Sequence, residues 1–181
     1  MTGTREDTEA KLVAMITKWV SIMKWHPNYE KRLRGRVYQE DFQKERIRNL
    51  TEFLGDLSEK KILELGCGMG GLAVALEREM YEVIPVDFNM SKCQITRFRG
   101  QRYNMNVSPV NARGENLPFK EQLFDAACLF DVLEHVQSPE KVLNELFRVL
   151  KPGGSVMVTV INKYAFRDPH YHMRFINWMP K

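Results

Sequence analysis

Four glycines within six residues stand between a short apolar run and a helical pattern, and this stretch constrains the fold most. The apolar run is Lys61–Leu65, the glycines lie between residues 66 and 71, and apolar residues then recur at helical spacing from Leu72 to Met80. Glycine lets the backbone turn sharply and approach a ligand closely, and the helix N-terminus beyond it offers unpaired N–H groups. The stretch therefore predicts a strand, a ligand-binding turn and a helix, in place of an ordinary tight turn.

The chain after residue 60 alternates short apolar runs with helical segments. Strands are predicted at 61–65, 82–86, 126–130 and 155–161, and the helix predicted at 139–150 has the clearest apolar stripe. Strands that alternate with helices pair in parallel, because a parallel pair needs a crossover of about a dozen residues or more. Right-handed crossovers then predict a doubly wound, mostly parallel, Rossmann-like α/β sheet with helices on both faces.

The first 58 residues are predicted to form a helical cap, followed by the sheet domain at 59–181. Apolar residues recur at helical spacing across 6–25 and again across 39–54, and a charged stretch at 30–36 separates these two predicted helices. Trp19, Trp25 and Tyr29 add more apolar surface than a helix that lies only on the outside of the protein would need. We therefore expect residues 19–38 to lie over the ligand pocket as a lid, and the second helix to cover one face of the sheet.

Charge and cysteine usage exclude several classes of protein. The chain has 27 Lys+Arg against 23 Asp+Glu, and the resulting charge of +4 is weak support for binding nucleic acid. Arg97, Arg99 and Arg102 are interpreted as a solvated helix face. Three scattered cysteines predict neither a disulfide framework nor a metal site. No apolar run approaches the ~18 residues of a membrane span, and the polar start lacks a signal peptide, so a cytoplasmic protein is expected.

The glycine loop by itself leaves two classes of nucleotide open. Gly66, Gly68 and Gly71 satisfy GxGxxG, and Asp87 follows Gly66 by 21 residues at the end of the next predicted strand. A dinucleotide-binding fold requires the same pattern, so a NAD(P)-dependent oxidoreductase stays open. Glu64, an acid inside the strand before the first glycine, favours a cationic ligand over a pyrophosphate.

Six stretches, in the right order, resemble the class I S-adenosylmethionine-dependent methyltransferases. They are Glu64-Leu65-Gly66-Cys67-Gly68-Met69-Gly70, Asp87, Gly114-Glu115-Asn116-Leu117-Pro118-Phe119, Phe124-Asp125, Leu133-Glu134-His135-Val136 and Leu146-Phe147-Arg148-Val149-Leu150-Lys151-Pro152-Gly153-Gly154. The resemblance covers residues 60–161 and points to the small-molecule enzymes of the ubiquinone/menaquinone-biosynthesis-like group. It implies an enzyme that transfers a methyl group from S-adenosylmethionine to a small-molecule acceptor, which the sequence does not identify.

The resemblance also implies which residues hold the methionine part of the cofactor. This part would lie against the glycine loop and the ends of the first and fourth strands, at Glu64, Gly66, Cys67, Gly68, Gly70 and Phe130. Glu64 would order the loop or reach the ammonium group, and the carbonyl of Phe130 would receive the same group.

The other implied contacts involve the nucleoside and the reacting methyl group. Asp87 would accept hydrogen bonds from both ribose hydroxyls, a task that suits a carboxylate, and Phe88 would cover the adenine face. Asn111 stands where the family commonly has aspartate, and with Ala112 it would meet the adenine edge. His135 would lie near the methyl donor and take a proton near neutral pH, unless it only serves the start of a helix.

By the standard of this resemblance the chain is short at its C-terminal end. The family adds a helix and an antiparallel hairpin after the fifth strand, and only residues 162–181 remain here, so the C-terminal strands are predicted to be missing. An exposed strand edge invites pairing, which makes a homodimer the expected assembly. A noncatalytic module that binds S-adenosylmethionine without turnover is the alternative.

Overall fold

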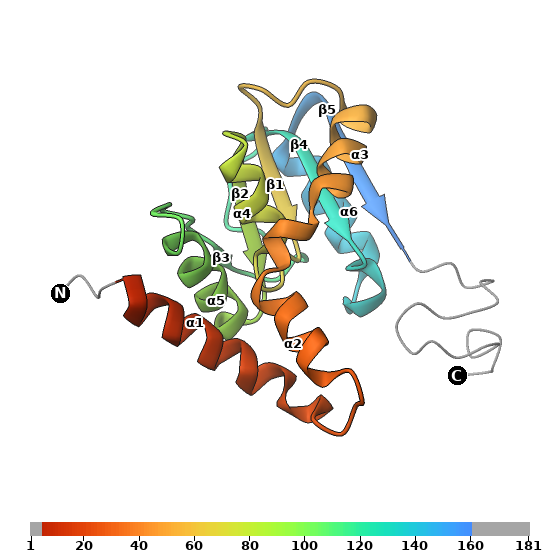
Figure 1. Cartoon of the computed structure of the whole chain (residues 1–181). Coiled ribbons are helices and arrows are strands. Elements are labelled where there is room, and N and C mark those ends of the chain that lie inside the picture. The colour runs from red at the N-terminus through yellow and green to blue at the C-terminus, as the bar shows by residue number, and fades with distance from the viewer. Residues whose placement is uncertain (1–4, 161–181) are drawn as a thin grey trace.

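The computed structural model describes residues 5–160, and its centre is one sheet of five parallel strands (Figure 1). The strands are β1 (Lys61–Leu65), β2 (Glu82–Asp87), β3 (Val110–Asn111), β4 (Phe124–Phe130) and β5 (Leu150–Thr159). Their order across the sheet is β3-β2-β1-β4-β5, and every neighbouring pair is parallel. The predicted parallel α/β sheet is confirmed, and the direction in which strands are added reverses between β1 and β4.

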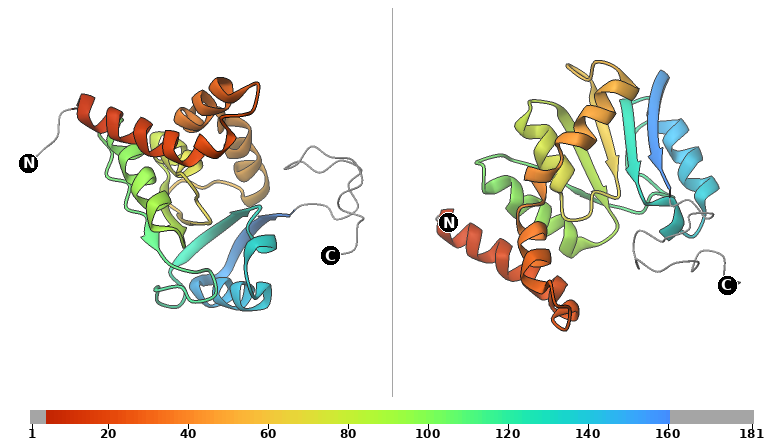
Figure 2. Two further views of the ribbon diagram at one scale, coloured as in Figure 1. Left: turned by 90° about the horizontal axis from the view of Figure 1, so that it is seen from below. Right: turned by 45° about the vertical axis from the view of Figure 1, so that its right-hand side comes forward.

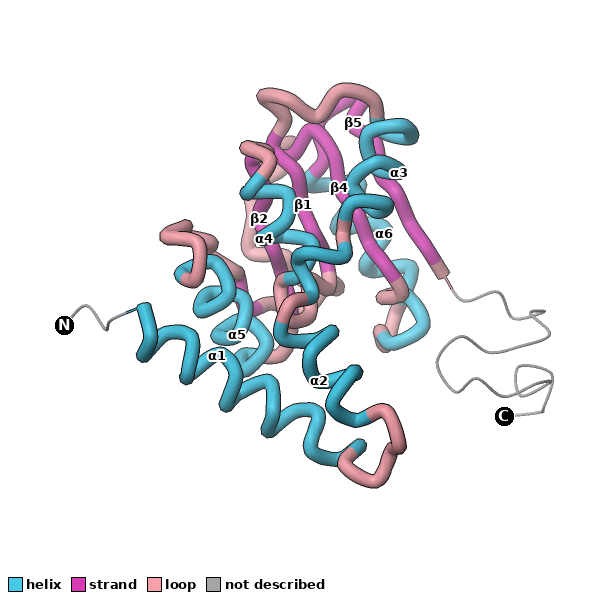
Figure 3. Tube along the Cα trace, viewed as in Figure 1, coloured by secondary structure: helices cyan, strands magenta, loops and turns pink. Residues whose placement is uncertain are grey.

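Helices cover both faces of this sheet (Figures 2 and 3). α3 (Lys44–Leu54), α4 (Gly71–Arg78) and α5 (Met90–Gln101) lie on one side, and α6 (Pro139–Val149) lies on the other. Right-handed crossovers explain why the helices divide between the two faces. β2 and β3 are added on one side of β1, whereas β4 and β5 are added on the other side. Ser138 caps α6 by accepting a hydrogen bond from the Lys141 N–H, as its position before Pro139 predicts.

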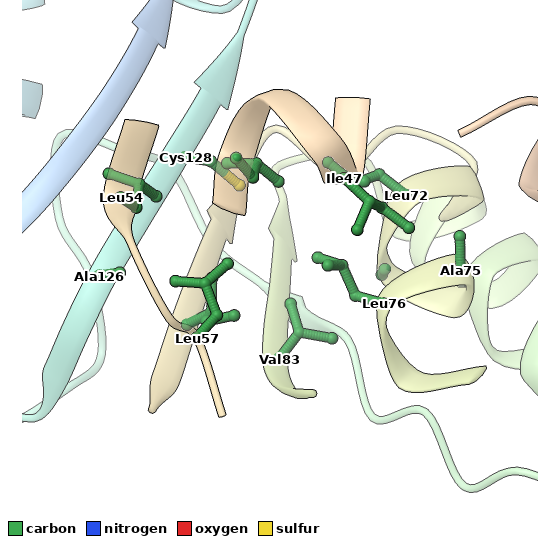
Figure 4. Close-up of a cluster of buried hydrophobic side chains, with 12 residues drawn as sticks. Ile47, Leu54, Leu57, Leu72, Ala75, Leu76, Val83, Ala126 and Cys128 are labelled. Atoms are coloured by element: carbon green, nitrogen blue, oxygen red, sulfur yellow. The ribbon is translucent and has the colours of Figure 1, made fainter. Parts of the chain in front are cut away.

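Alternation along β1 builds the two apolar layers of the core. Ile62 packs beneath α3 and α4, whereas Leu63 and Leu65 pack in the layer that α6 covers, because successive side chains of a strand point to opposite faces. Figure 4 shows the first layer, where Ile47 of α3 lies near Leu76 of α4. A strand buried on both faces reads as a nearly continuous apolar run, which is why the sequence identified β1.

The N-terminal region has one helix more than the sequence predicts. α1 (Arg5–Val20) continues into the short turn η1 (Ser21–Met23), so the first helix ends earlier than expected. The expectation that residues 30–36 only separate two helices is wrong, because this stretch forms α2 (Tyr29–Val37). Leu33 and Val37 lie one turn apart and join the apolar cluster of Leu12 and Ile16, so two apolar residues anchor a helix whose other side chains are mostly polar.

The second predicted helix, at 39–54, is divided at Gln43. Residues before it form the short turn η2 (Gln39–Phe42), and α3 begins after it. The buried residues Ile47, Leu50 and Leu54 recur at helical spacing and pack on the sheet, so the prediction that this helix covers a face is confirmed.

The interpretation of α5 as a solvated arginine face is wrong for two of its three arginines. Arg97 is exposed, but Arg99 is wholly buried and Arg102 nearly so. Both pair with Glu40 of η2, and Arg102 also pairs with Glu9 of α1. The cap covers this end of α5, and the sequence gives no sign of that contact because the partners are about 60 and 90 residues away.

β5 begins earlier than the predicted Ser155. Leu150 already pairs with Phe124, and the register resumes with Ser155 opposite Ala126, so residues 151–154 form a bulge inside the strand. The stretch 162–181, with the predicted loss of C-terminal strands, lies outside the described residues. Among residues 5–160, no helix combines the length and the apolar character needed to cross a bilayer.

Candidate functional site

The predicted site residues meet at the carboxyl ends of the strands. Chain crossovers leave β1 and β4 toward opposite faces, which opens a crevice where open α/β sheets bind ligands. The glycine loop follows β1, Asp87 ends β2 and Asp131 follows β4. This edge of the sheet faces the segment of α1 and α2 in Figure 1.

The glycine loop has a backbone that only glycine adopts without strain. Gly66, Gly68 and Gly70 have φ of +78°, +58° and +75°, in the left-handed region that disfavours residues with a side chain. The N–H groups of Gly66 and Cys67 both donate to the carbonyl of Val86, at 2.8 and 2.9 Å. A Cβ on Gly66 would collide with Val132, and one on Gly70 with Thr96, whereas the space beside Gly68 is open.

Asp87 ties the glycine loop to the end of β2. Its Oδ2 accepts a hydrogen bond from the Gly68 N–H at 2.9 Å, and its Oδ1 accepts one from the Asn89 N–H at 2.8 Å. Each carboxylate oxygen has a second lone pair, so Asp87 can still accept from two hydroxyl groups of a ligand. Its side chain is buried, yet it lines a cavity with Phe88.

Glu64 is a buried acid with an unused acceptor. Its Oε2 has no hydrogen-bond partner among the described residues. Burial raises the pKa of Glu64 to about 8, against the attraction of the Arg46 guanidinium and a backbone N–H, and the neighbouring Asp87 adds to the rise. The Oε2 atom of Glu64 therefore lacks a hydrogen-bond donor, and a cationic donor would form the strongest bond with it.

Two cavities adjoin the loop and share Leu65 and Gly66 in their walls. The larger cavity, of about 450 Å³, is bounded by Glu64, by the loop, by the end of β4 and by the cap. The smaller cavity, of about 140 Å³, is bounded by Asp87 and by segments that follow β3 and β4. An elongated ligand that crosses the glycine loop would place one end in each cavity.

The predicted residues divide between these cavities. Glu64, Cys67, Gly68 and Phe130 line the larger one, Asp87, Phe88, Ala112 and His135 line the smaller one, and Gly66 lines both. The structure thus brings His135 together with Asp87 and separates it from Glu64.

Two of the predicted residues have other tasks. Gly70 caps the N-terminus of α4 and lines neither cavity, and Asn111 lines neither, because its Nδ2 donates to the Asp87 carbonyl at 3.0 Å. The Ala112 N–H donates to the same carbonyl at 3.2 Å. These two bonds hold the end of β3 against β2.

Comparison with known proteins identifies the family. A sequence model described as "Methyltransferase domain" matches residues 63–158, which is more than half of the chain. The chain belongs to the methyltransferase domain family. It is a class I S-adenosylmethionine-dependent methyltransferase domain, and this membership implies S-adenosylmethionine as the cofactor.

The relatives and neighbours of this methyltransferase domain agree in fold. The Klebsiella pneumoniae ubiquinone biosynthesis O-methyltransferase is 33% identical over 119 residues, which are 65% of this chain and 49% of that protein. The chain therefore spans about half the length of the curated relatives it matches. The crystal structure of the PH0226 protein from Pyrococcus horikoshii has a TM-score of 0.59 at 27% identity, over 67% of this chain and 60% of that one. A SAM-dependent methyltransferase from Thermotoga maritima has a TM-score of 0.57 at 25% identity, over 77% and 59%.

The site of the methyltransferase domain fits the cofactor. The buried and unpartnered Oε2 of Glu64 lies in the wall of the larger cavity, where an ammonium group would supply the missing donor. Open space beside Gly68 leaves room for a ligand against the backbone. Asp87 stands at the other side of the loop with acceptor capacity for ribose hydroxyls.

Three wall residues, Arg46, Lys92 and Arg113, are missing from the sequence analysis, whereas Trp19 and Arg36 fall within its predicted lid segment, residues 19–38. Trp19, Arg36 and Arg46 of the first 58 residues and Lys92 of α5 line the larger cavity, and Arg113 lines the smaller one. Only Trp19 carries a signal in the sequence, as an aromatic residue at the end of an apolar stripe. The cations lie in ordinary polar patterns, and their position at the cavity depends on how the helices pack.

Proposed function

We propose that this chain is an S-adenosylmethionine-dependent methyltransferase that acts on a small-molecule acceptor. The observation that carries the proposal is the buried Glu64 oxygen without a partner, beside a glycine loop that Asp87 holds from its other side. A dinucleotide would bring a pyrophosphate to this loop, where an adjacent acid is unfavourable. A zwitterionic amino acid with a nearby nucleoside suits both acids.

Each proposed contact follows from the position of its residue. Glu64 binds the ammonium group, and the carbonyl of Phe130 at the end of β4 accepts from the same group. Asp87 binds the ribose, Phe88 packs on the adenine with an exposed ring, and Ala112 borders it. S-adenosylmethionine supplies an electrophilic methyl group, and the protein contributes alignment of the two reactants and exclusion of water.

His135 is the proposed acceptor of the proton that a hydroxyl or amine loses on methylation. It sits in the one-turn helix η3 (Leu133–His135), directly after β4, and lines the cavity that also contains Asp87. A histidine changes its charge near neutral pH, which suits this role. A lower methyl-transfer rate in His135→Gln, with the dissociation constant of S-adenosylhomocysteine unchanged, supports the role.

The cap formed by residues 1–58 is proposed to act as a lid on the sheet domain at 59–181. Trp19, Val20, Met23 and Arg36 come from the expected lid segment, residues 19–38, and line the larger cavity. Closure of this segment would exclude water from the methyl donor.

The setting of the enzyme is also a proposal. A net charge of only +4 gives little support for a nucleic-acid partner, and a small-molecule enzyme of the cytoplasm is the proposed setting. Among residues 5–160, β5 is the last strand on its side of the sheet, with Val158 and Val160 exposed at its end, and this edge supports a homodimer.

The test of the proposed function is transfer of labelled methyl groups. The protein is mixed with methyl-labelled S-adenosylmethionine and a panel of phenols, amines and carboxylates, and label in the product is compared with the S-adenosylhomocysteine formed. Equal amounts of the two are expected. Stoichiometric binding of S-adenosylhomocysteine with no transfer to any member of the panel favours the noncatalytic alternative.

Two glycine variants provide a matched control for this assay. Gly68 and Gly55 have φ of +58° and +76°, and neither has an atom within 4 Å of an added Cβ. Alanine at either position carries backbone strain. At Gly55, where ψ is −162° in a region essentially restricted to glycine, the strain is about 1–3 kcal/mol, so Gly55→Ala is the more demanding control for folding. Gly68→Ala is expected to abolish most of the transfer because its Cβ enters the cofactor cavity, and Gly55→Ala, at the end of α3, is expected to retain it.

A further inference from the structure

The wall of the larger cavity carries three cations from three different helices. Arg36 belongs to α2, Arg46 to α3 and Lys92 to α5. In the described part of the chain, none of the three forms an ion pair with a carboxylate; exposed arginines such as Arg97 also lack one, but only these three share the wall of the larger cavity. Three cations that converge on one cavity without carboxylate partners indicate a ligand with negative charge.

The acids in the same wall do not neutralise all three cations. Glu64 holds a proton at neutral pH in the absence of ligand, because burial raises its pKa to about 8. The Asp131 carboxylate accepts a hydrogen bond from the neutral Thr159 hydroxyl at 3.2 Å, which leaves its charge in place, so it can offset one of the three cations but not all of them. The cavity therefore keeps a positive excess that the protein itself does not balance.

The proposed cofactor accounts for only one of the cations. Its ammonium and carboxylate groups are attached to the same carbon, so the carboxylate must lie close to the ammonium held by Glu64. Arg46 is the cation whose charge acts on Glu64, and its guanidinium lies 4.8 Å from the centre of the Phe130 ring. Arg46 is thus the partner for the cofactor carboxylate, and Arg36 and Lys92 remain.

Lys92 stands beside an aromatic wall. Its ammonium lies 5.8 Å from the ring centre of Trp19 and 6.0 Å from that of Phe88. Trp19 is 39% exposed and faces the cavity, so its indole offers an apolar plane next to the cation. A ligand with an apolar or flat body and an anionic group matches this pair of features.

We propose that the methyl acceptor carries a carboxylate or phosphate group, which Arg36 and Lys92 bind while its body packs on Trp19. The inference rests on the proposed function, because it assigns to the acceptor the part of the cavity that the cofactor leaves. It names the substrate class of the same site. Neutral acceptors of the same shape leave both cations unpaired and bind more weakly.

The test measures binding to the protein saturated with S-adenosylhomocysteine, by titration calorimetry. One pair of probes is 4-hydroxybenzoate and the neutral 4-hydroxybenzamide, and 4-nitrophenyl phosphate forms the phosphate arm. The anionic probe of the correct class is expected to bind about tenfold more tightly than the neutral one, the scale of one charge-assisted contact. Whichever anion binds more tightly identifies the group.

Variants that each remove one positive charge test which residues cause the preference for an anionic probe. Lys92→Gln and Arg36→Gln are each expected to remove about fivefold of the preference or more, with the dissociation constant of S-adenosylhomocysteine changed less than about twofold. Lys44→Gln on α3 and Arg34→Gln on α2 remove the same charge outside the cavity and are expected to preserve the preference.

The outcomes separate this inference from the proposed function. A protein that binds no S-adenosylhomocysteine contradicts the proposed function, and with it the assignment of the cavity. Normal binding of S-adenosylhomocysteine, with the benzoate and phosphate bound no better than the amide or not at all, overturns the inference alone. A tenfold loss of S-adenosylhomocysteine affinity in Lys92→Gln or Arg36→Gln also overturns it, because the cation then serves the cofactor.

Discussion

Two groups of helices are attached to this domain by different chemistry. α3 and α4 pack on the sheet through buried hydrocarbon side chains such as Leu50 and Leu76. The outer part of the cap, made of α1, α2 and η2, shares a smaller apolar cluster with α5, and its buried polar contacts include two arginines, Arg99 and Arg102. Hydrocarbon packing has no preferred direction, whereas guanidinium contacts require each acceptor in its place.

Arg99 shows how the guanidinium contacts connect several elements through one side chain. Its Nη1 donates to the Val37 carbonyl at 2.8 Å and pairs with Glu40, and its Nη2 donates to the Arg36 carbonyl at 2.8 Å. Its Nε donates to the carbonyl of Met69, inside the glycine loop, also at 2.8 Å. One side chain therefore connects α2 and η2 to the cofactor loop, so a change in this attachment is expected to affect ligand binding, whereas a change in the apolar packing of α3 or α4 on the sheet is not.

The largest expected effect comes from Arg99→Met. This change should lower the free energy of unfolding by about 3–5 kcal/mol, because it leaves the Glu40 carboxylate buried with one charged partner fewer. The affinity for S-adenosylhomocysteine should fall as well, because the Met69 carbonyl loses its donor. Urea unfolding and titration calorimetry measure the two effects.

Leu50→Ala is the matched control, since Leu50 is as fully buried as Arg99 but belongs to α3 and packs on the sheet. It should cost about 2–5 kcal/mol of stability by creating a cavity, with the affinity for S-adenosylhomocysteine unchanged. Equal affinities in both variants would mean that the cap is not coupled to the loop.

The sequence predicts the hydrocarbon-packed region far better than the cap. Periodicity marks β1 and α6 because their buried faces are apolar and local in sequence. The same reasoning finds Glu64 and Asp87, which stand at fixed positions relative to two strands. It misses α2, and it reads Arg99 as solvated, because the burial of a charge depends on a distant partner.

The residues of the candidate site also differ in how well the sequence predicts them. Loop residues such as Gly66 are predictable because a positive φ leaves a sequence signature. Asn111 is predicted as an adenine contact, but it lines neither cavity and its amide holds the end of β2. Lys92 is not predicted at all, and Arg36 is predicted only as part of the lid segment 19–38, since a cation has no fixed place in a periodic pattern.

Asp87→Ala tests the site itself, with the next largest effect. Loss of the ribose contacts should weaken the binding of S-adenosylhomocysteine by about 2–3 kcal/mol, the scale of hydrogen bonds to a charged group. Asp125→Ala removes an acid at the amino end of β4, where its partners are Lys151 and the Lys61 N–H, and should leave binding unchanged. An unaltered dissociation constant in a folded Asp87→Ala protein would move the ribose elsewhere.

A smaller effect is expected from the proton on Glu64. Its folded pKa of about 8 lies above the ordinary 4.5, so the stabilisation from this proton is fully present below pH 4.5 and is lost as the pH rises through 8. The cofactor ammonium should lower this pKa, so binding near pH 7 should release a fraction of a proton. Calorimetry in buffers of different ionisation enthalpy measures the release, and Glu64→Gln should show none.

The smallest signal is hydrogen exchange in the cap. If residues 19–38 act as a lid, their amides should exchange more slowly when S-adenosylhomocysteine is bound, because closure protects them. The amides of residues 50–54, at the end of α3 away from Arg46, should not respond, since that part of the helix is held by the sheet. Slower exchange in the glycine loop with no change in residues 19–38 would contradict the lid and leave the cofactor site intact.

Titration of the purified protein with S-adenosylhomocysteine and, separately, with NAD tests the central assignment most directly. The buried acid Glu64 beside the glycine loop requires a cationic group, so saturable binding of one S-adenosylhomocysteine per chain is expected, and no binding of NAD. Saturable binding of NAD without binding of S-adenosylhomocysteine would contradict the assignment of the cofactor and, with it, the proposed methyl transfer.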